Sequence, residues 1–151
     1  RARQSALDVA SGRYIAFLDS DDQWLPDKLE RQLRHMAEHD AAMSYTQFRR
    51  IDAAGGRLGK LIDVPERLTY RDLLCNTAIA TSTVLIDRDK TGPLTMTQTY
   101  YDDYALWLGI LRRGFVARTR GSASAAPVRR RQPRRRVPRL DQRPRPDRCD
   151  R

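Results

Sequence analysis

The sequence predicts an α/β fold in which helices flank a buried sheet. The clearest indication is residues 14–18, a short apolar run rich in β-formers that is typical of a strand buried on both faces, as in a parallel sheet covered by helices. Two later stretches, about 26–39 and 102–113, space their apolar residues as amphipathic helices do. With 151 residues, the chain has room for one domain.

Three carboxylates, Asp19, Asp21 and Asp22, follow the predicted strand directly. They lie at its carboxyl end, which is where open α/β sheets place their ligands. Burying these acids without a counter-charge would be costly, because they repel one another and lose hydration. Their hard oxygens suit Mg²⁺ or Mn²⁺, and both ions commonly bridge to phosphate. A solvated acidic turn is the simpler explanation of a lone Asp-x-Asp, but the buried strand before these acids and the Trp24-Leu25-Pro26 segment after them weaken that explanation here.

The segments around the acids predict two helices. Residues 2–10 resemble the end of a helix, with Gly12 near its C-cap. A second helix is expected from about Pro26, which suits the first helical position, and Asp27 complements the helix dipole there. Its predicted buried stripe consists of Leu29, Leu33 and Met36.

Two histidines, His35 and His39, lie four residues apart near the end of the second predicted helix. This spacing could mimic a metal pair, but we find no Glu or further His in register with them. We therefore expect a solvated helix face.

The middle of the chain predicts scaffold. Residues 42–49 have strand composition, a turn is expected at 52–56, and 57–62 are expected to return as a strand. Thr69 and Asp72 form a start resembling a capping box for a short helix that ends near residue 76. A loop and a strand follow over 77–88. The hydroxyls of Thr81, Ser82 and Thr83 could bind a sugar, although a role at the strand edge is favoured.

A third informative stretch covers residues 101–114. Its apolar residues Tyr104, Trp107, Leu108 and Leu111 predict an amphipathic helix that Gly114 closes. The first turn of this helix holds Asp102 and Asp103, and the helix dipole favours negative charge there. From the residues alone, helix capping is the simplest explanation of this acidic pair.

Two of these stretches resemble the inverting glycosyltransferases of family 2, which have the GT-A fold, a Rossmann-like nucleotide-diphospho-sugar transferase fold. The first match runs from Gly12 through Asp22 and continues with Trp24, Pro26, Lys28 and Leu29. The second is residues 102–107, which match a Glu-Asp-Tyr-x-Leu-Trp motif of the family. The chain departs from that motif in having Asp102 where Glu is usual.

The resemblance implies roles for both acidic sites. Asp19 and Asp21 would hold Mg²⁺ or Mn²⁺ together with the diphosphate of a nucleotide-diphospho-sugar donor, and Asp22 would support them. Asp103 would be the catalytic base, with Asp102 as the second choice. The acceptor side would include the three hydroxyls named above and Trp107.

The resemblance also implies a reaction and a place. The expected reaction is metal-assisted, inverting transfer of a sugar to the hydroxyl of a saccharide or lipid-linked acceptor, as in polysaccharide biosynthesis. Two cysteines without close spacing indicate no disulfide framework. We expect a cytoplasmic protein that associates peripherally with the cytoplasmic face of the membrane.

Family members carry a further part of the sheet, with acids that bind the base and ribose, before the first helix. We therefore expect residues 1–116 to form a partial GT-A domain that lacks this N-terminal nucleotide-binding part. Such a fragment is expected to show weak activity or none.

The last 35 residues have a different composition. All of the net charge of +10 falls in residues 117–151, and residues 1–116 are neutral. An Arg/Pro-rich segment without apolar periodicity cannot bury enough surface to fold, so this tail is expected to be disordered. Two interpretations stay open: a basic arm, or the product of a frameshift near residue 117, which is favoured.

Two other function classes match parts of the sequence. A basic arm could bind nucleic acid or an anionic surface by charge alone, but the neutral body argues against a specific nucleic-acid partner. A Mg²⁺-dependent phosphatase of the haloacid dehalogenase type also places Asp-x-Asp after a buried strand. It is disfavoured because Asp22 and Gln23 follow the second Asp, and no later Lys with paired Asp is evident.

Overall fold

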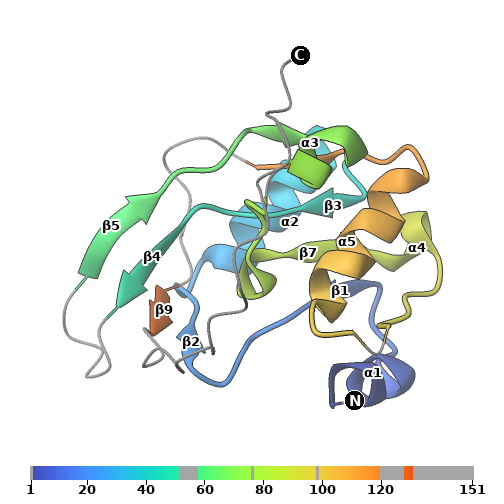
Figure 1. Ribbon diagram of the computed structural model, residues 1–151, viewed down its shortest axis with the longest axis horizontal. Coiled ribbons are helices and arrows are strands. Elements are labelled where there is room, and N and C mark those ends of the chain that lie inside the picture. The colour runs from blue at the N-terminus through green and yellow to red at the C-terminus, as the bar shows by residue number, and fades with distance from the viewer. Residues whose placement is uncertain (1, 52–57, 76, 98, 120–127, 131–151) are drawn as a thin grey trace, which may run out of the picture.

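The computed structural model describes residues 2–51, 58–75, 77–97, 99–119 and 128–130 (Figure 1). It confirms the predicted α/β class, with helices packed on a mixed sheet. The helices are α1 (Ala2–Val9), α2 (Lys28–Glu38), α3 (Tyr70–Cys75), the 3₁₀ helix η1 (Thr81–Thr83), α4 (Arg88–Thr91) and α5 (Asp102–Arg112). The strands are β1 (Tyr14–Ala16), β2 (Asp22–Gln23), β3 (Met43–Ser44), β4 (Phe48–Ile51), β5 (Leu58–Ile62), β6 (Arg67–Leu68), β7 (Leu85–Asp87), β8 (Ala117–Arg118) and β9 (Val128–Arg130).

The central sheet has the strand order β1-β7-β3-β8-β6. Only β3 and β8 are parallel neighbours, and β7 runs antiparallel to both β1 and β3. The predicted parallel strand buried on both faces is therefore wrong for residues 14–18. Ile15 and Phe17 are buried, whereas Tyr14 and Leu18 are exposed, because side chains alternate between the two faces of a strand.

Helices cover both faces of the central sheet. On one face, Ile86 of β7 joins a large core with side chains of α3 and α5, including Leu73, Trp107 and Ile110. On the other face, the neighbouring Leu85 packs against Met36 of α2. Figure 1 shows α5 in front of this sheet and α2 behind it. This layering places the starts of α1 and α5 near the end of β1.

The buried face of α2 differs from the predicted stripe. Met36 is buried, but Leu29 and Leu33 are exposed, and the other buried side chains are Lys28, Gln32 and His35. A polar face is tolerated because the Gln32 amide donates hydrogen bonds to the Ser44 hydroxyl and the Thr83 carbonyl, each over 2.9 Å. The expected solvated face is also wrong for His35, although His39 is exposed.

The other predicted elements are largely confirmed. Helix α1 ends before Gly12, and the Asp72 carboxylate accepts hydrogen bonds from the backbone and hydroxyl of Thr69 at the start of α3. Helix α5 ends before Gly114, whose φ of 91° favours glycine. The expected strand over 42–49 is split between β3 and β4, and the turn expected at 52–56 lies outside the described residues.

The sheet continues beyond residue 116. Ala117 is fully buried in β8, and the Thr119 amide donates to the Glu66 carbonyl over 2.9 Å. The tail boundary predicted at residue 117 is therefore at least three residues early. Strand β8 pairs with β3 on one side and with β6 on the other, and Thr119 continues the contact with Glu66. Within the rest of the predicted tail, the structure describes β9, which lies between β2 and β4 in a second sheet of order β2-β9-β4-β5. Within the described residues, no helix is long and apolar enough to cross a membrane.

Candidate active site

A cleft of about 550 Å³ opens where α1, the end of β1 and the start of α5 meet. Asp19 lines it from the segment after β1, and Asp102 lines it from the first turn of α5. The fold thus brings together one acid from each of the two motifs that the sequence singled out. Asp21, Asp22 and Asp103 are not among the residues that line this cleft. Asp22 is instead buried at the start of β2.

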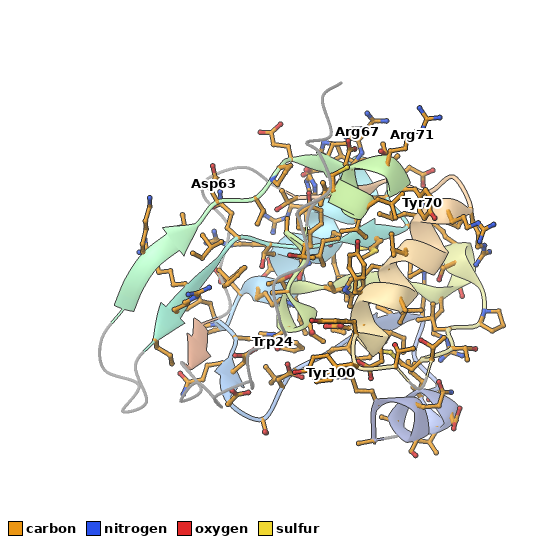
Figure 2. All side chains as sticks on the ribbon, viewed as in Figure 1. Trp24, Asp63, Arg67, Tyr70, Arg71 and Tyr100 are labelled. Carbon is orange, nitrogen blue, oxygen red and sulfur yellow. The ribbon has the colours of Figure 1, made fainter. Side chains whose placement is uncertain are left out.

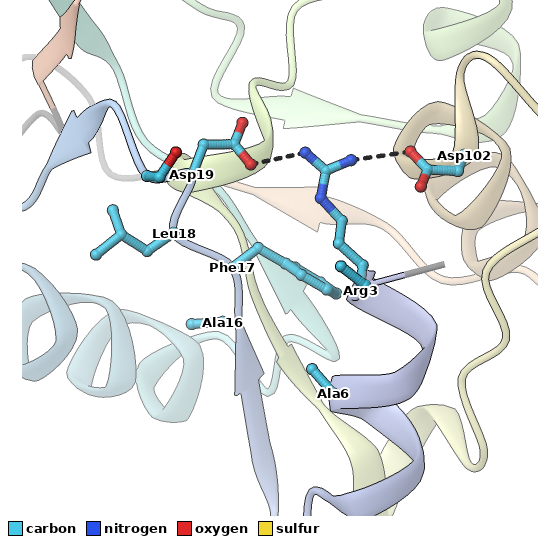
Figure 3. A pocket seen from close by; sticks show the side chains of 9 residues that line it. Arg3, Ala6, Ala16, Phe17, Leu18, Asp19 and Asp102 are labelled. Carbon is cyan, nitrogen blue, oxygen red and sulfur yellow. Dashed lines mark hydrogen bonds and ion pairs between the residues drawn. The ribbon is translucent and has the colours of Figure 1, made fainter.

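Arg3 of α1 joins the two acidic sites (Figure 3). Its Nη2 lies 2.6 Å from Asp19 Oδ1, and its Nη1 lies 2.9 Å from Asp102 Oδ1. Burial alone would lower the pKa of the guanidinium, but its hydrogen bond to Asp19 and the nearby charges of Asp102 and Asp103 raise that pKa overall. Arg3 therefore stays charged and compensates both carboxylates.

The backbone around Asp19 is held by η1. The Asp19 amide donates to the Ser82 hydroxyl over 3.0 Å, and the indole Nε1 of Trp24 donates to the Ser82 carbonyl over 2.8 Å. A turn hydrogen bond from the Asp22 amide to the Asp19 carbonyl closes the acidic segment. Ser82 is buried, so this geometry makes it a support of the acidic loop.

The catalytic base expected at Asp103 is oriented from two sides. Its Oδ2 accepts a hydrogen bond from the Thr81 hydroxyl, and its Oδ1 accepts one from the Tyr104 amide over 2.7 Å. The neighbouring Asp102 Oδ1 accepts from the Asp103 amide over 2.8 Å as well as from Arg3. Thr81 is thus a contact of the predicted base in this structure.

Trp107 and Thr83 are buried in this structure. Trp107 is 1% exposed and packs edge-on against Phe17, with ring centroids 5.7 Å apart. This contact fastens α5 to the chain that leads into Asp19. The Thr83 hydroxyl donates to the Ala80 carbonyl over 2.6 Å, which is a contact within η1.

Lys28 lies beneath the acidic loop at the start of α2. The side chain is 1% exposed, and its ammonium lies 4.2 Å from the centroid of the Trp24 ring. Burial lowers the pKa of Lys28 to about 7. Trp24, which follows β2 (Figure 2), therefore contacts both Lys28 and the Ser82 carbonyl.

Sequence reasoning missed the position of Arg3 between Asp19 and Asp102. Its place in the first turn of a helix gives no signal of a partner, because both contacts depend on tertiary structure. The supporting role of Ser82 was also missed, although the polar run at 81–83 was noted as a candidate. The two acidic motifs, in contrast, carried a signal in their residue types and order.

Comparisons with known proteins identify the family of the chain. The model of the family described as glycosyl transferase family 2 matches residues 1–94. The chain is 49% identical over 117 residues to the teichuronic acid biosynthesis glycosyltransferase TuaG of Bacillus subtilis strain 168, covering 77% of this chain and 46% of TuaG. It is 40% identical over 111 residues to the UDP-Glc:alpha-D-GlcNAc-diphosphoundecaprenol beta-1,3-glucosyltransferase WfgD of Escherichia coli, covering 74% of this chain and 43% of WfgD.

Solved structures support the fold. The structure of S. aureus TarS 1-349 in complex with UDP-GlcNAc superposes with a TM-score of 0.58 at 15% identity, covering 87% of this chain and 38% of the TarS 1-349 chain. The chain spans less than half the length of TuaG and of WfgD. The family model covers well over half of the chain, and the fold agrees with it. The chain therefore belongs to glycosyl transferase family 2, and its described part is a GT-A glycosyltransferase fold.

Proposed function

We propose that this chain carries the reaction centre of an inverting, metal-assisted glycosyltransferase. A sugar would move from a nucleotide-diphospho-sugar donor to an acceptor hydroxyl. The observation that carries the proposal is the convergence of Asp19 and Asp102 on one cleft, where Arg3 joins them, with Asp103 next to Asp102 in the first turn of α5. In an inverting transfer, the group that binds the donor diphosphate and the catalytic base lie on opposite sides of the anomeric carbon. Acids from two separate elements, the segment after β1 and the start of α5, could fill these two positions.

The carboxylate ligands that follow β1 fit Mg²⁺ or Mn²⁺. Asp19 and Asp21 offer hard carboxylate oxygens, and Asp19 is paired with a positive group, the Arg3 guanidinium, over 2.6 Å. When bound, the metal would offset the negative charge that develops on the departing nucleotide diphosphate. Asp22 would support the segment through its turn hydrogen bond to the Asp19 carbonyl.

Asp103 would accept the proton of the acceptor hydroxyl as that oxygen attacks the anomeric carbon. The hydrogen bonds from Thr81 and the Tyr104 amide would fix its carboxylate, and the start of α5 favours negative charge. Asp102, which pairs with Arg3 beside Asp103, is the second candidate for the catalytic base.

The relatives suggest the classes of donor and acceptor. WfgD is named for a UDP-glucose donor and a diphosphoundecaprenol-linked acceptor, and TarS was solved with UDP-GlcNAc. We infer a UDP-sugar donor and a saccharide acceptor on a lipid carrier for this chain. A lipid-linked acceptor would place the reaction at the cytoplasmic face of the membrane, with peripheral association of the protein. Since the matched relatives are about twice as long as the matched segment, we expect weak turnover or none from the isolated chain.

The test is transfer of radiolabelled glucose from UDP-glucose to a GlcNAc-diphospholipid during long incubations with excess protein. Any transfer should require Mn²⁺ and should fall by about 10²–10⁴ in Asp103→Asn, which is the usual contribution of a general base. Asp27→Asn is the matched control, because Asp27 is an acid of the same region that pairs with Arg31. Transfer at the wild-type rate by both Asp102→Asn and Asp103→Asn would overturn the proposed base.

A further inference from the structure

Three potential metal ligands gather at the C-terminal end of α2, away from the cleft. His35, Glu38 and His39 each present a ligand atom, and these atoms lie within 4.8 Å of one another. The sequence interpretation found no Glu in register with the histidines, but Glu38 joins them because residues three apart lie on one helix face. The imidazole rings of the two histidines are 4.2 Å apart between centroids.

The pair is partly ordered without any metal. His39 Nδ1 lies 3.0 Å from the His35 carbonyl, so a proton on Nδ1 satisfies a carbonyl of the last helical turn. That tautomer leaves Nε2 with a free lone pair, which is the form in which imidazole binds a metal. His35 is buried, whereas Glu38 and His39 are exposed, so the cluster is open to solvent from the side of these two residues.

The chemistry of the cluster differs from that of the acidic cleft. Two imidazoles and one carboxylate suit Zn²⁺ and its neighbours and do not suit Mg²⁺. Tetrahedral bonds of this type need ligand atoms about 3.3 Å apart, which small rotations from the observed spacing can provide. Seven residues of α2 separate His35 from Lys28 at the start of the helix, which is about 10 Å along its axis.

We propose that His35, Glu38 and His39 form a second metal site, for a divalent transition metal of the Zn²⁺ class. The site is independent of the proposed glycosyl transfer. It ties the last turn of α2 together at the point where the chain turns into β3. Water or an external ligand fills the remaining coordination position.

The composition of the chain makes a direct test possible. The chain contains two histidines, so any imidazole signal from an untagged protein comes from this pair. Both cysteines, of which Cys75 is exposed, are replaced by serine to remove competing thiols. Zn²⁺ binding is then measured by isothermal titration calorimetry, and bound Cu²⁺ is examined by electron paramagnetic resonance for coupling to imidazole nitrogen.

We expect one Zn²⁺ per chain, Cu²⁺ coupled to two imidazole nitrogens, and no binding of Mg²⁺ here. His39→Gln should lower the Zn²⁺ affinity at least about tenfold, and Glu38→Gln should lower it measurably. Glu30→Gln is the matched control, because it removes one carboxylate from the same helix outside the cluster. Asp19→Asn should leave Zn²⁺ binding unchanged, so failure of the acidic cleft would not imitate failure of this site.

Equal Zn²⁺ affinity in the wild type and Glu38→Gln, or Cu²⁺ without imidazole coupling, would overturn the proposal. Loss of Zn²⁺ binding in Asp19→Asn would do the same, because it would assign the ion to the cleft. Glu38→Gln changes an exposed side chain, so the test does not depend on the folding of the His39 variant.

Discussion

Replacing Lys28 by methionine should stabilise the protein at neutral pH. The ammonium group is almost fully buried, and burial lowers the pKa of Lys28 from 10.5 to about 7. A pKa difference of this size corresponds to about 5 kcal/mol, since each pH unit is worth about 1.36 kcal/mol. Methionine keeps most of the chain length and its contact with the Trp24 ring while removing the charge.

The cation–π contact offsets part of this cost. An ammonium over a desolvated Trp ring contributes about 2 kcal/mol, so the net gain from Lys28→Met should be about 3 kcal/mol below pH 7. The gain should shrink as the pH rises. In the folded state Lys28 loses its proton near pH 7, and in the unfolded state it keeps that proton up to about pH 10.5. The wild-type free energy of unfolding should therefore rise with pH in this window.

Urea denaturation at pH 6, 7.5 and 9.5 measures this difference. Burial raises the pKa of Tyr45, which opposes the trend above about pH 10, so the series stops at pH 9.5. Subtracting the two proteins isolates Lys28, because both contain Tyr45 and the same acids. A Lys28→Met variant that is no more stable than the wild type at pH 6, with an unchanged pH slope, would refute the reasoning.

Three further outcomes can be measured. Arg3→Gln should tighten Mn²⁺ binding by calorimetry, because it removes the cation that competes for Asp19, and Arg31→Gln should not. Trp107→Leu should cost about 3 kcal/mol in thermal unfolding, since a fully buried ring leaves a cavity between α5 and β1. Asp87→Asn should destabilise the protein at pH 7 and flatten the acid limb of a pH–stability series. The Arg13 guanidinium holds the pKa of that carboxyl below its usual range, so its contribution is lost only below about pH 4.

The sequence predicted elements whose signals are local. The Thr69–Asp72 cap and the Gly114 terminus of α5 depend on residues within one turn of each other, and both were confirmed. The acids at 19–22 and 102–103 were recognised because their residue types and order are unusual. The structure brings Asp19 and Asp102 to one cleft, where Arg3 joins them.

Other features depend on contacts that no local pattern encodes. The antiparallel pairing of β1 with β7 joins Ile15 to Ile86, and nothing near either residue specifies that partner. Gln32 is buried on α2 because Ser44 and the Thr83 carbonyl accept its hydrogen bonds, which a hydrophobic stripe cannot predict. Arg3 was missed for the same reason, since its two acceptors come from distant parts of the chain.

The most direct test of the central claim is calorimetric titration of UDP in the presence of Mn²⁺. The account assigns donor binding to Asp19 and proton removal to Asp103, so the two variants should separate. Asp19→Asn should lose Mn²⁺-dependent UDP binding, whereas Asp103→Asn should bind UDP as the wild type does. Equal UDP affinity in the wild type and Asp19→Asn, or no Mn²⁺ dependence in the wild type, would contradict a metal-assisted donor site at the end of β1.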